Sequence, residues 1–285
     1  MFLVTDITGH VGKAVVAELA RQSVAVRVLT QDPAELPVQA PDIETIRGSL
    51  ADTGTSVGLF KGIEAVFLAS PLSPQMAEVQ RPMVEAARAA GVKRFVQLSG
   101  VGADASFCCA RALRWLGQAE NTTGCSELTV TRLRPTTLLQ NLLEFAPSIA
   151  AHGLLSGPFR STRWTWVDAR DVGAVAVAAL RDRAHDGRTY TVTGTESLSY
   201  REVAQRMSRI FGKEVRYVDI TANEARGWLQ AKGAAPVMIE AKLEMWDAYA
   251  SNLINAEPTS VVQEVTGRAP RSVDDFLEDY RDRFV

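Results

Sequence analysis

The sequence has few of the features that mark secreted or membrane-bound proteins. It contains only three cysteines, an odd number, and Cys108 and Cys109 are adjacent, so no disulfide framework is predicted. No apolar run reaches the roughly eighteen residues of a membrane span. The N-terminal residues lack the basic start and the cleavage site of a signal peptide. We therefore expect a protein of the reducing cytoplasm that does not enter a membrane.

The sequence also lacks a strong charge of either sign. Its 31 lysines and arginines nearly balance 33 aspartates and glutamates, for a net charge of −2, which argues against nucleic acid as a partner. There are three histidines and no Cys, His and carboxylate residues at ligand spacing, so no metal site is predicted. A Gly-x-Ser-x-Gly motif is missing, which argues against a hydrolase of that type.

Short apolar runs alternate with helical segments through the first half of the chain. Val11, Val15 and Leu19 recur every four residues, which marks the buried face of a helix. Apolar strands separated by helices favour a parallel sheet covered on both faces. The predicted strands span residues 2–5, 24–30, 43–46, 65–69, 94–98 and 128–133.

The second half of the chain is richer in helical patterns. Ser199 and Thr221 each stand three residues before a glutamate, the capping-box signature of a helix start. Beyond them the chain is amphipathic and helical. The elements predicted before them are helices at residues 138–150 and 172–180, a turn-rich passage at 152–158, and strands at 164–167 and 190–193.

These patterns predict an α/β fold in two parts. Residues 1–135 are expected to form a Rossmann-type doubly wound parallel sheet. Residues 136–285 are expected to form a smaller, mostly helical C-terminal lobe that covers the substrate and returns some segments to the main sheet.

The first predicted strand runs into a glycine-containing loop, Thr5-Asp-Ile-Thr-Gly9-His-Val-Gly12, and then directly into a helix. Glycines at this point of a Rossmann fold let backbone N–H groups and the helix N-terminus approach a pyrophosphate. The strand before the loop and the helix after it make the pattern specific for the fold. The loop therefore predicts a dinucleotide-binding domain.

This loop resembles the TGATGxxG loop of the NmrA-like family of atypical short-chain dehydrogenase/reductases. The resemblance continues in residues 26–33, 62–71, 86–96, 133–141 and 193–200. In that order, these segments are similar to the family's VRALVRDP, GVDAVFLVSP, AAKAAGVKRFV, LRPxxxxQN and TGPEALSY. The family includes quinone and dye reductases and also cofactor-sensing regulators, and many of its members are dimers.

The resemblance implies NADPH or NADH as the cofactor, a small aromatic molecule as the substrate, and a homodimer. The residues that stand at the cofactor positions of the family pattern are Thr5, Thr8, Gly9, His10, Val11, Gly12, Gln31, Ser49, Ala69, Ser70 and Ser99.

Three of the cofactor positions depart from the family pattern. Asp6 replaces the first loop glycine, Gln31 replaces the arginine that faces the 2′-phosphate, and Ser49 replaces an aspartate near the adenine. Arg27 could replace the lost cation only if it faces the cleft. Two like charges about 4 Å apart repel by about 4 kcal/mol at an effective dielectric near 20, which weakens binding on the order of a thousandfold. The penalty shrinks if Asp6 points away, or if it caps the helix and occupies the anion site itself.

The acid–base pair of short-chain dehydrogenases is missing as well. No Tyr-x-x-x-Lys motif lies between Ser99 and Glu120, and the His or Lys that many NmrA-like proteins carry four residues before the glutamate is Leu116. Three candidates for catalysis remain. Ser99 lies at the carboxyl edge of the predicted sheet, where ligands bind, His152 precedes a glycine near the expected cleft, and Asp6 lies in the loop.

A few polar and aromatic residues are expected around the substrate. Thr136 and Thr137 follow the sixth predicted strand, and Asn141 belongs to the family's QN signature. Trp164 and Trp166 alternate on one face of a predicted strand. They could form an aromatic wall for a planar substrate, although core packing would explain them too.

Three functions are compatible with these residues. The first is an NAD(P)H-dependent reductase of a quinone-like or conjugated aromatic molecule, because hydride transfer to a quinone needs little acid–base help. The second is a non-redox, cofactor-independent enzyme that catalyses cyclisation, coupling, dehydration or isomerisation, with Asp6 in place of the phosphate. The third is a regulatory protein that senses the dinucleotide. The family resemblance favours the first.

Overall fold

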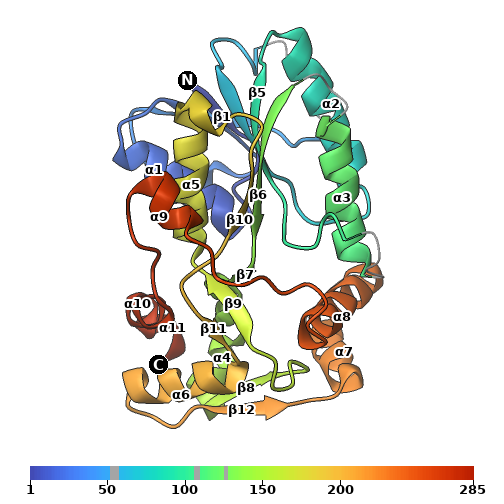
Figure 1. Ribbon diagram of the computed structural model, residues 1–285, viewed down its shortest axis with the longest axis vertical. Coiled ribbons are helices and arrows are strands. Elements are labelled where there is room, and N and C mark those ends of the chain that lie inside the picture. The colour runs from blue at the N-terminus through green and yellow to red at the C-terminus, as the bar shows by residue number, and fades with distance from the viewer. Residues whose placement is uncertain (52–57, 106–109, 125–127) are drawn as a thin grey trace.

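The centre of the upper half of the molecule is a parallel β-sheet (Figure 1). The computed structural model describes residues 1–51, 58–105, 110–124 and 128–285, so Cys108 and Cys109 lie outside the described residues. Within these ranges the sheet has seven strands in the order β10-β6-β5-β4-β1-β2-β3, all parallel. The strands are β1 (Phe2–Val4), β2 (Val26–Thr30), β3 (Ile43–Arg47), β4 (Ala65–Leu68), β5 (Arg94–Leu98), β6 (Thr129–Pro135) and β10 (Thr189–Val192).

The strand order reverses between β1 and β4, as in a doubly wound Rossmann sheet. The predicted α/β fold class is therefore confirmed. The six strands predicted in the first half are all present, with ends shifted by no more than two residues. Their apolar residues identify them because a parallel sheet is buried on both faces.

Helices cover both faces of the sheet (Figure 1). α1 (His10–Arg21) and α5 (Ala169–Arg181) pack together on one face, with α9 (Val261–Thr266) beside α5. α2 (Met76–Ala89) and α3 (Arg111–Gly124) pack together on the other. The predicted stripe of α1 is buried, and α1 approaches α5 closely because a Cβ on Gly173 would lie 2.8 Å from the Cβ of Ala14.

The lower half of the molecule is a lobe built from the second half of the chain (Figure 1). It contains a three-stranded sheet, β11-β9-β7, and a two-stranded sheet, β12-β8, in the described residues. These strands are β7 (Thr137–Leu138), β8 (Leu154–Gly157), β9 (Trp164–Val167), β11 (Ser197–Leu198) and β12 (Arg216–Asp219). The helices of the lobe are α4 (Ala146–His152), α6 (Tyr200–Phe211), α7 (Ala222–Ala231), α8 (Pro236–Ala250), α10 (Val273–Asp279) and α11 (Arg281–Phe284), with a 3-10 segment at Leu139–Phe145. Two short 3-10 segments, Pro33–Glu35 and Arg183–His185, belong to the connections of the main sheet.

Two expectations for the lobe were wrong. The passage at residues 152–158 was expected to be turns, but it contains β8, which pairs with β12 far along the chain. The helix expected at 138–150 is a 3-10 segment followed by α4, which has a proline in its first turn. Pro147 lacks the backbone N–H that a continuous helix needs there. The capping boxes at Ser199 and Thr221 are both present, as predicted.

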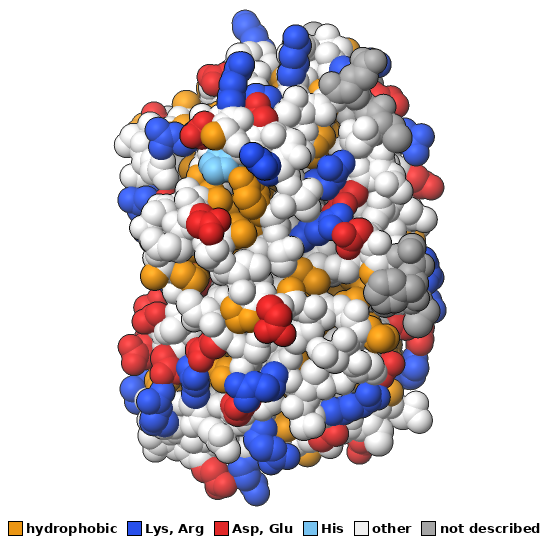
Figure 2. All heavy atoms as spheres, viewed as in Figure 1, with side chains coloured by type: hydrophobic (Ala, Val, Ile, Leu, Met, Phe, Trp, Pro, Cys, Tyr) orange, Lys and Arg blue, Asp and Glu red, His pale blue; other side chains and the backbone are white. Residues whose placement is uncertain are grey.

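The surface and the helix lengths agree with the composition. On the face drawn in Figure 2, basic and acidic side chains are interspersed. Among the helices that the structure describes, none is both long and apolar enough to cross a membrane.

The substitution Gly12→Ala is expected to destabilise the protein, because its Cβ would lie 1.8 Å from the carbonyl oxygen of Asp6. Overpacking of this kind costs about 2 kcal/mol or more and lowers Tm by several degrees. Gly9→Ala is the matched control, since nothing lies within 4 Å of its Cβ. Calorimetry of both variants measures the difference, and equal Tm values would contradict the close approach of α1 to the loop.

Candidate functional site

Two cavities adjoin each other along the carboxyl edge of the main sheet. The first, which we call the loop cleft, has a volume of about 270 Å³ and lies over the ends of β1, β2, β3 and β4. It is lined by Thr5, Asp6, Ile7, Thr8, Leu29, Thr30, Gln31, Gly48, Ser49, Leu50, Ala51, Ser70, Pro71, Ser73, Met76 and Val79. Because the strand order reverses between β1 and β4, this is where a doubly wound sheet binds its ligand.

The start of α1 is open to an anion. Gly9 is the N-cap residue and offers no side chain to the free N–H groups of the first turn. Gly9 and His10 are exposed, whereas Val11 and Gly12 are buried. A Cβ on Gly9 would meet open space. Backbone N–H groups and the helix dipole are therefore available to a phosphate.

The Asp6 carboxylate is bound to its own loop. Its Oδ1 accepts hydrogen bonds from the backbone N–H of Thr8 at 2.8 Å and from the Thr8 hydroxyl at 2.7 Å. This is a local turn of the Asx type. The alternative in which Asp6 caps α1 and occupies the anion site is therefore wrong, because the carboxylate is committed to Thr8 instead.

Thr5 and Ala69 join the two strands at which the order reverses. The Thr5 hydroxyl donates to the carbonyl oxygen of Ala69 at 2.7 Å and accepts from its N–H at 2.9 Å. Thr5 and Ala69 are both buried. Next to them, the Ser70 hydroxyl accepts a hydrogen bond from Gln80 at 2.9 Å. These predicted cofactor residues thus shape the floor of the loop cleft.

Gln31 and Ser49 both line the loop cleft, as their place in the family pattern implies. Arg27 does not replace the lost cation. Its guanidinium donates to Glu44 at 2.9 Å and to the carbonyl oxygen of Leu59 at 2.7 Å, away from the cleft. The described residues that line the cleft include no lysine or arginine, so a 2′-phosphate would have no charged partner among them.

The second cavity, which we call the interlobe pocket, lies between the ends of β5 and β6 and the helices of the lobe. Its volume is about 670 Å³. Its residues are Leu72, Ser99, Gly100, Val101, Leu113, Leu116, Pro135, Thr136, Thr137, Leu138, Asn141, Glu144, Phe145, Phe159, Trp164, Tyr200, Leu229, Lys232, Ala234, Met238, Ile239, Ala241, Lys242, Met245, Trp246 and Tyr249. Leu72 follows Ser70 and Pro71 of the loop cleft, so the cavities are neighbours.

Most of the residues predicted for substrate or catalysis meet in the interlobe pocket. Ser99, Thr136, Thr137, Asn141 and Trp164 all line it. They come together because β5, β6 and β9 direct their carboxyl ends or one face toward the same space.

Two of the residues predicted for catalysis or substrate binding line neither cavity. Trp166 is buried behind Trp164, with ring centroids 6.3 Å apart, and its indole N–H donates to the carbonyl oxygen of Leu198 at 3.0 Å. Only one of the two tryptophans therefore reaches the pocket. His152, expected near the cleft, is the exposed last residue of α4, because the chain turns away at Gly153.

Two buried hydrogen-bond donors of the interlobe pocket have no partner. These are the Ser99 hydroxyl and the indole N–H of Trp164, which lack a hydrogen bond to any described residue. Ser99 is 7% exposed and Trp164 2%. A buried donor without a partner costs about 1–3 kcal/mol, so a ligand that accepts a hydrogen bond from either donor is favoured here.

The pocket also holds polar residues that the sequence analysis missed. Burial raises the pKa of Tyr200, and burial raises the pKa of Tyr249 to about 12 against an opposing hydrogen bond with Thr137. Both phenols therefore stay neutral and act as hydrogen-bonding groups. Tyr200 stands in the segment similar to TGPEALSY, which was the signal for it. Lys232 and Lys242 had no local signal at all.

Two polar residues of the family-like motifs near the pocket make structural contacts. Gln140 donates to Asp168 at 2.8 Å and accepts from the N–H of Ala169 at 2.9 Å, which ties the lobe to the start of α5. Glu120, the glutamate of the family pattern, accepts from Arg134 at 2.6 Å. Neither side chain lines the interlobe pocket.

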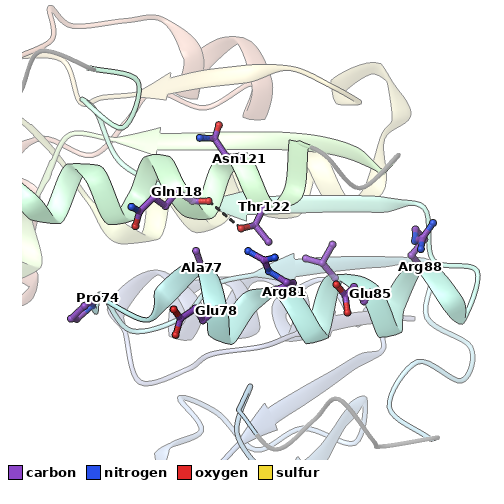
Figure 3. A pocket seen from close by; sticks show the side chains of 10 residues that line it. Pro74, Ala77, Glu78, Arg81, Glu85, Arg88, Gln118, Asn121 and Thr122 are labelled. Carbon is purple, nitrogen blue, oxygen red and sulfur yellow. Dashed lines mark hydrogen bonds between the residues drawn. The ribbon is translucent and has the colours of Figure 1, made fainter.

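A third cavity of about 730 Å³ is an open groove between α2 and α3. Figure 3 shows Glu78, Arg81, Glu85 and Arg88 along α2, with Gln118 and its neighbours on α3 opposite. No strand end lines this groove in the described part of the chain. We therefore do not assign it to the site.

Comparisons with known proteins agree with this geometry. The model of the NmrA-like family matches residues 1–277. An NAD(P)H azoreductase of Xenophilus azovorans is 33% identical over 98% of this chain and 97% of its own length. A (4-alkanoyl-5-oxo-2,5-dihydrofuran-3-yl)methyl phosphate reductase of Streptomyces griseus is 34% identical over 100% of this chain and 99% of its own.

Among solved structures, the NADPH-dependent quinone oxidoreductase QOR2 of Escherichia coli, complexed with NADPH, superposes with a TM-score of 0.85. It is 20% identical and covers 99% of this chain and 100% of its own, a likeness of fold. The family model and the two relatives that match along their whole length show that the chain belongs to the NmrA-like family.

Proposed function

We propose that the protein is an NAD(P)H-dependent reductase of a quinone-like or dye-like conjugated small molecule. The observation that carries this proposal is the pair of unpartnered donors, Ser99 and Trp164, in an apolar pocket beside the loop cleft. A conjugated ring fits such a pocket, and its oxygen or nitrogen accepts the two hydrogen bonds. The relatives from Xenophilus azovorans and Streptomyces griseus are both named as reductases.

The residues of the loop cleft fit a dinucleotide. Beside the cleft, the uncapped first turn of α1, with backbone N–H groups of His10, Val11 and Gly12, would hold the pyrophosphate. Gly9 would leave room for its close approach. Thr8, Gln31 and Ser49, which line the cleft, would contact the adenosine, and Ser70 would stand on the side of the interlobe pocket. When bound, the nicotinamide supplies a hydride to the substrate.

The interlobe pocket explains how reduction proceeds without a tyrosine–lysine pair. In a conjugated acceptor, the added electrons become negative charge on oxygen or nitrogen. The Ser99 hydroxyl and the Trp164 indole N–H are the donors available to such atoms, and donors in a site of low dielectric stabilise developing charge strongly. Thr136, Thr137 and Asn141 orient the substrate along the β6–β7 segment. A strong acid is not needed, because water can later supply the proton.

The two other functions predicted from sequence have less support. A non-redox enzyme required Asp6 in the anion site, whereas Asp6 accepts from Thr8 and leaves α1 uncapped. A regulatory sensor requires the loop cleft but not two donors in a separate pocket. The aromatic character of the substrate, the homodimer and the cytoplasmic location remain predictions from the sequence.

The first experiment is a titration of the purified protein with NADPH and NADH, followed by tryptophan fluorescence. We expect micromolar binding, and then oxidation of the bound cofactor when naphthoquinone or an azo dye is added. Binding without turnover across such a panel would favour the sensor. No binding up to millimolar concentration would leave the non-redox enzyme.

The substitution Asp6→Asn is expected to tighten NADPH binding. Asparagine keeps the oxygen that accepts from Thr8 but removes the charge beside the pyrophosphate. A partly screened charge of this kind is worth about 1 kcal/mol, or about threefold to tenfold in Kd, and the gain should shrink as salt is added.

The matched control for Asp6 is Asp182→Asn, at the opposite edge of the sheet. Asp182 makes the same kind of bond, accepting from the N–H of Ala184 at 2.9 Å. Its substitution should leave Kd unchanged. If Asp6→Asn also leaves it unchanged at low salt, the carboxylate does not face the phosphates.

The substitutions Ser99→Ala and Trp164→Phe are expected to lower kcat/KM for the quinone by about tenfold to a hundredfold each. Each removes a donor that the free protein leaves unpartnered. Tm should therefore stay the same or rise for Ser99→Ala, whereas Trp164→Phe should lower Tm only by the packing that the smaller ring loses. Steady-state kinetics and calorimetry on the same samples measure both effects.

Trp166→Phe is the control on the same strand. It loses a hydrogen bond to Leu198 that the folded protein does make, so it should lower Tm and affect kcat/KM less. Full activity of both donor variants would refute the roles of Ser99 and Trp164.

A further inference from the structure

We infer that the substrate carries an anionic group, such as a phosphate, sulfonate or carboxylate, and that Lys232 and Lys242 bind it at the open side of the interlobe pocket. This inference rests on the proposed function, since it names the class of substrate for the same pocket. It comes from the placement of these two lysines, which line the pocket together with Glu144.

Both ammonium groups converge on one residue. The Nζ of Lys242 donates to the Glu144 carboxylate at 2.6 Å, and the Nζ of Lys232 donates to the backbone carbonyl oxygen of Glu144 at 3.0 Å. Lys232 follows α7, whereas Lys242 lies within α8. The packing of these two helices on each other therefore brings the two cations to the same place.

Aromatic rings hold the two cations at the pocket. The ammonium of Lys232 lies over the Trp228 ring, 3.9 Å from its centroid, and that of Lys242 lies 5.2 Å from the centroid of Trp246. Cation–π contacts of this kind restrain long side chains that would otherwise extend into water. The two charges are thus positioned before a ligand binds.

The charge of the pocket is unbalanced. Its described lining includes three ionised residues, so two lysines against the single glutamate leave a net charge of +1. The whole chain, by contrast, has a net charge of −2. Burial lowers the pKa of Lys232, and the positive charge of Lys242 lowers it further, whereas the negative charge of Glu144 raises it. An oxyanion between the two lysines would reduce the repulsion between their ammonium groups and neutralise the net positive charge of the pocket.

The two ends of the pocket suit two ends of one molecule. Ser99 is buried after the end of β5 and Trp164 is buried at the start of β9, whereas Lys232 is exposed and the Lys242 side chain is 28% exposed. The conjugated ring that is reduced lies at the inner end, close to the loop cleft. The anionic group lies at the outer end, on α7 and α8, which Figure 1 shows at the side of the lobe below α3.

The test compares naphthoquinone with its sulfonate in the NADPH-dependent reaction. For Lys232→Met and Lys242→Met, we expect kcat/KM for the sulfonate to fall about tenfold each, because each loses a partly desolvated contact with the anion. The neutral quinone should change by less than about twofold, since methionine keeps most of the apolar stem. Lys242→Arg keeps the charge and should retain the preference.

Two further variants sharpen the test. Glu144→Gln removes the competing carboxylate and should raise kcat/KM for the sulfonate by a few-fold, the opposite sign. Lys93→Met, an exposed lysine at the amino edge of the sheet, should change neither substrate. The same ratio of sulfonate to neutral quinone in wild type and lysine variants, with turnover intact, would overturn the inference and leave the proposed function standing.

A binding measurement separates the inference from the reductase function. Naphthalene sulfonate and naphthalene sulfonamide are titrated into the protein without turnover, with tryptophan fluorescence as the readout. We expect the sulfonate to bind more tightly, and the difference to be lost in Lys232→Met and Lys242→Met and reduced by salt. Equal affinity for the two probes would overturn the inference even in a protein that reduces quinones.

Discussion

The reversal of strand order between β1 and β4 is the constraint on which both cavities depend. Strands on either side of that point send their connections to opposite faces, so the loops at their carboxyl ends diverge and leave a cleft. The Thr5 hydroxyl, bonded to the backbone of Ala69 on the neighbouring strand end, holds the two strands together where the loops part. Without that bond the floor of the cleft would have two unpaired backbone groups.

The close approach of α1 to the loop is the second consequence of this arrangement. Gly12 lies against the carbonyl oxygen of Asp6, with no room for a side chain. The same contact directs the first turn of α1 at the cleft. A carboxylate in this loop would be a serious obstacle to a dinucleotide if it faced the helix N-terminus. The two hydrogen bonds from Thr8 to one carboxylate oxygen of Asp6 reduce this obstacle, because they hold the carboxylate within the loop.

The interlobe pocket shows a different balance between stability and ligand binding. Most polar groups around it are satisfied inside the protein, as the bonds of Gln140 to Asp168 and of Glu120 to Arg134 show. Ser99 and Trp164 are exceptions. Groups left unpaired at a cost to the free protein are the ones that a bound molecule can use. Their neighbours Tyr200 and Tyr249 keep the surroundings neutral, and the charged residues lie only at the outer side.

The strands of the main sheet, the glycine loop, the capping boxes and the family resemblance could all be predicted from the amino-acid sequence. These are properties of short stretches, since the burial of a strand or one face of a helix imposes its period on neighbouring residues. Ser99, Thr136 and Thr137 meet in one pocket because the carboxyl ends of parallel strands share an edge. Asn141 and Trp164 reach the same pocket from the 3-10 segment and from β9 of the lobe.

The directions of side chains and the contacts between distant segments could not be predicted from the sequence, because they depend on how the elements pack. Asp6 binds Thr8 rather than α1, Arg27 turns to Glu44, and Trp166 packs behind Trp164. No local sequence pattern predicts these side-chain directions, because each depends on the space and the hydrogen-bonding partners that neighbouring elements provide. The strongest case is the lysine pair, whose bonds to Glu144 span 88 and 98 residues. Such a contact exists only once α7 and α8 have packed against the lobe.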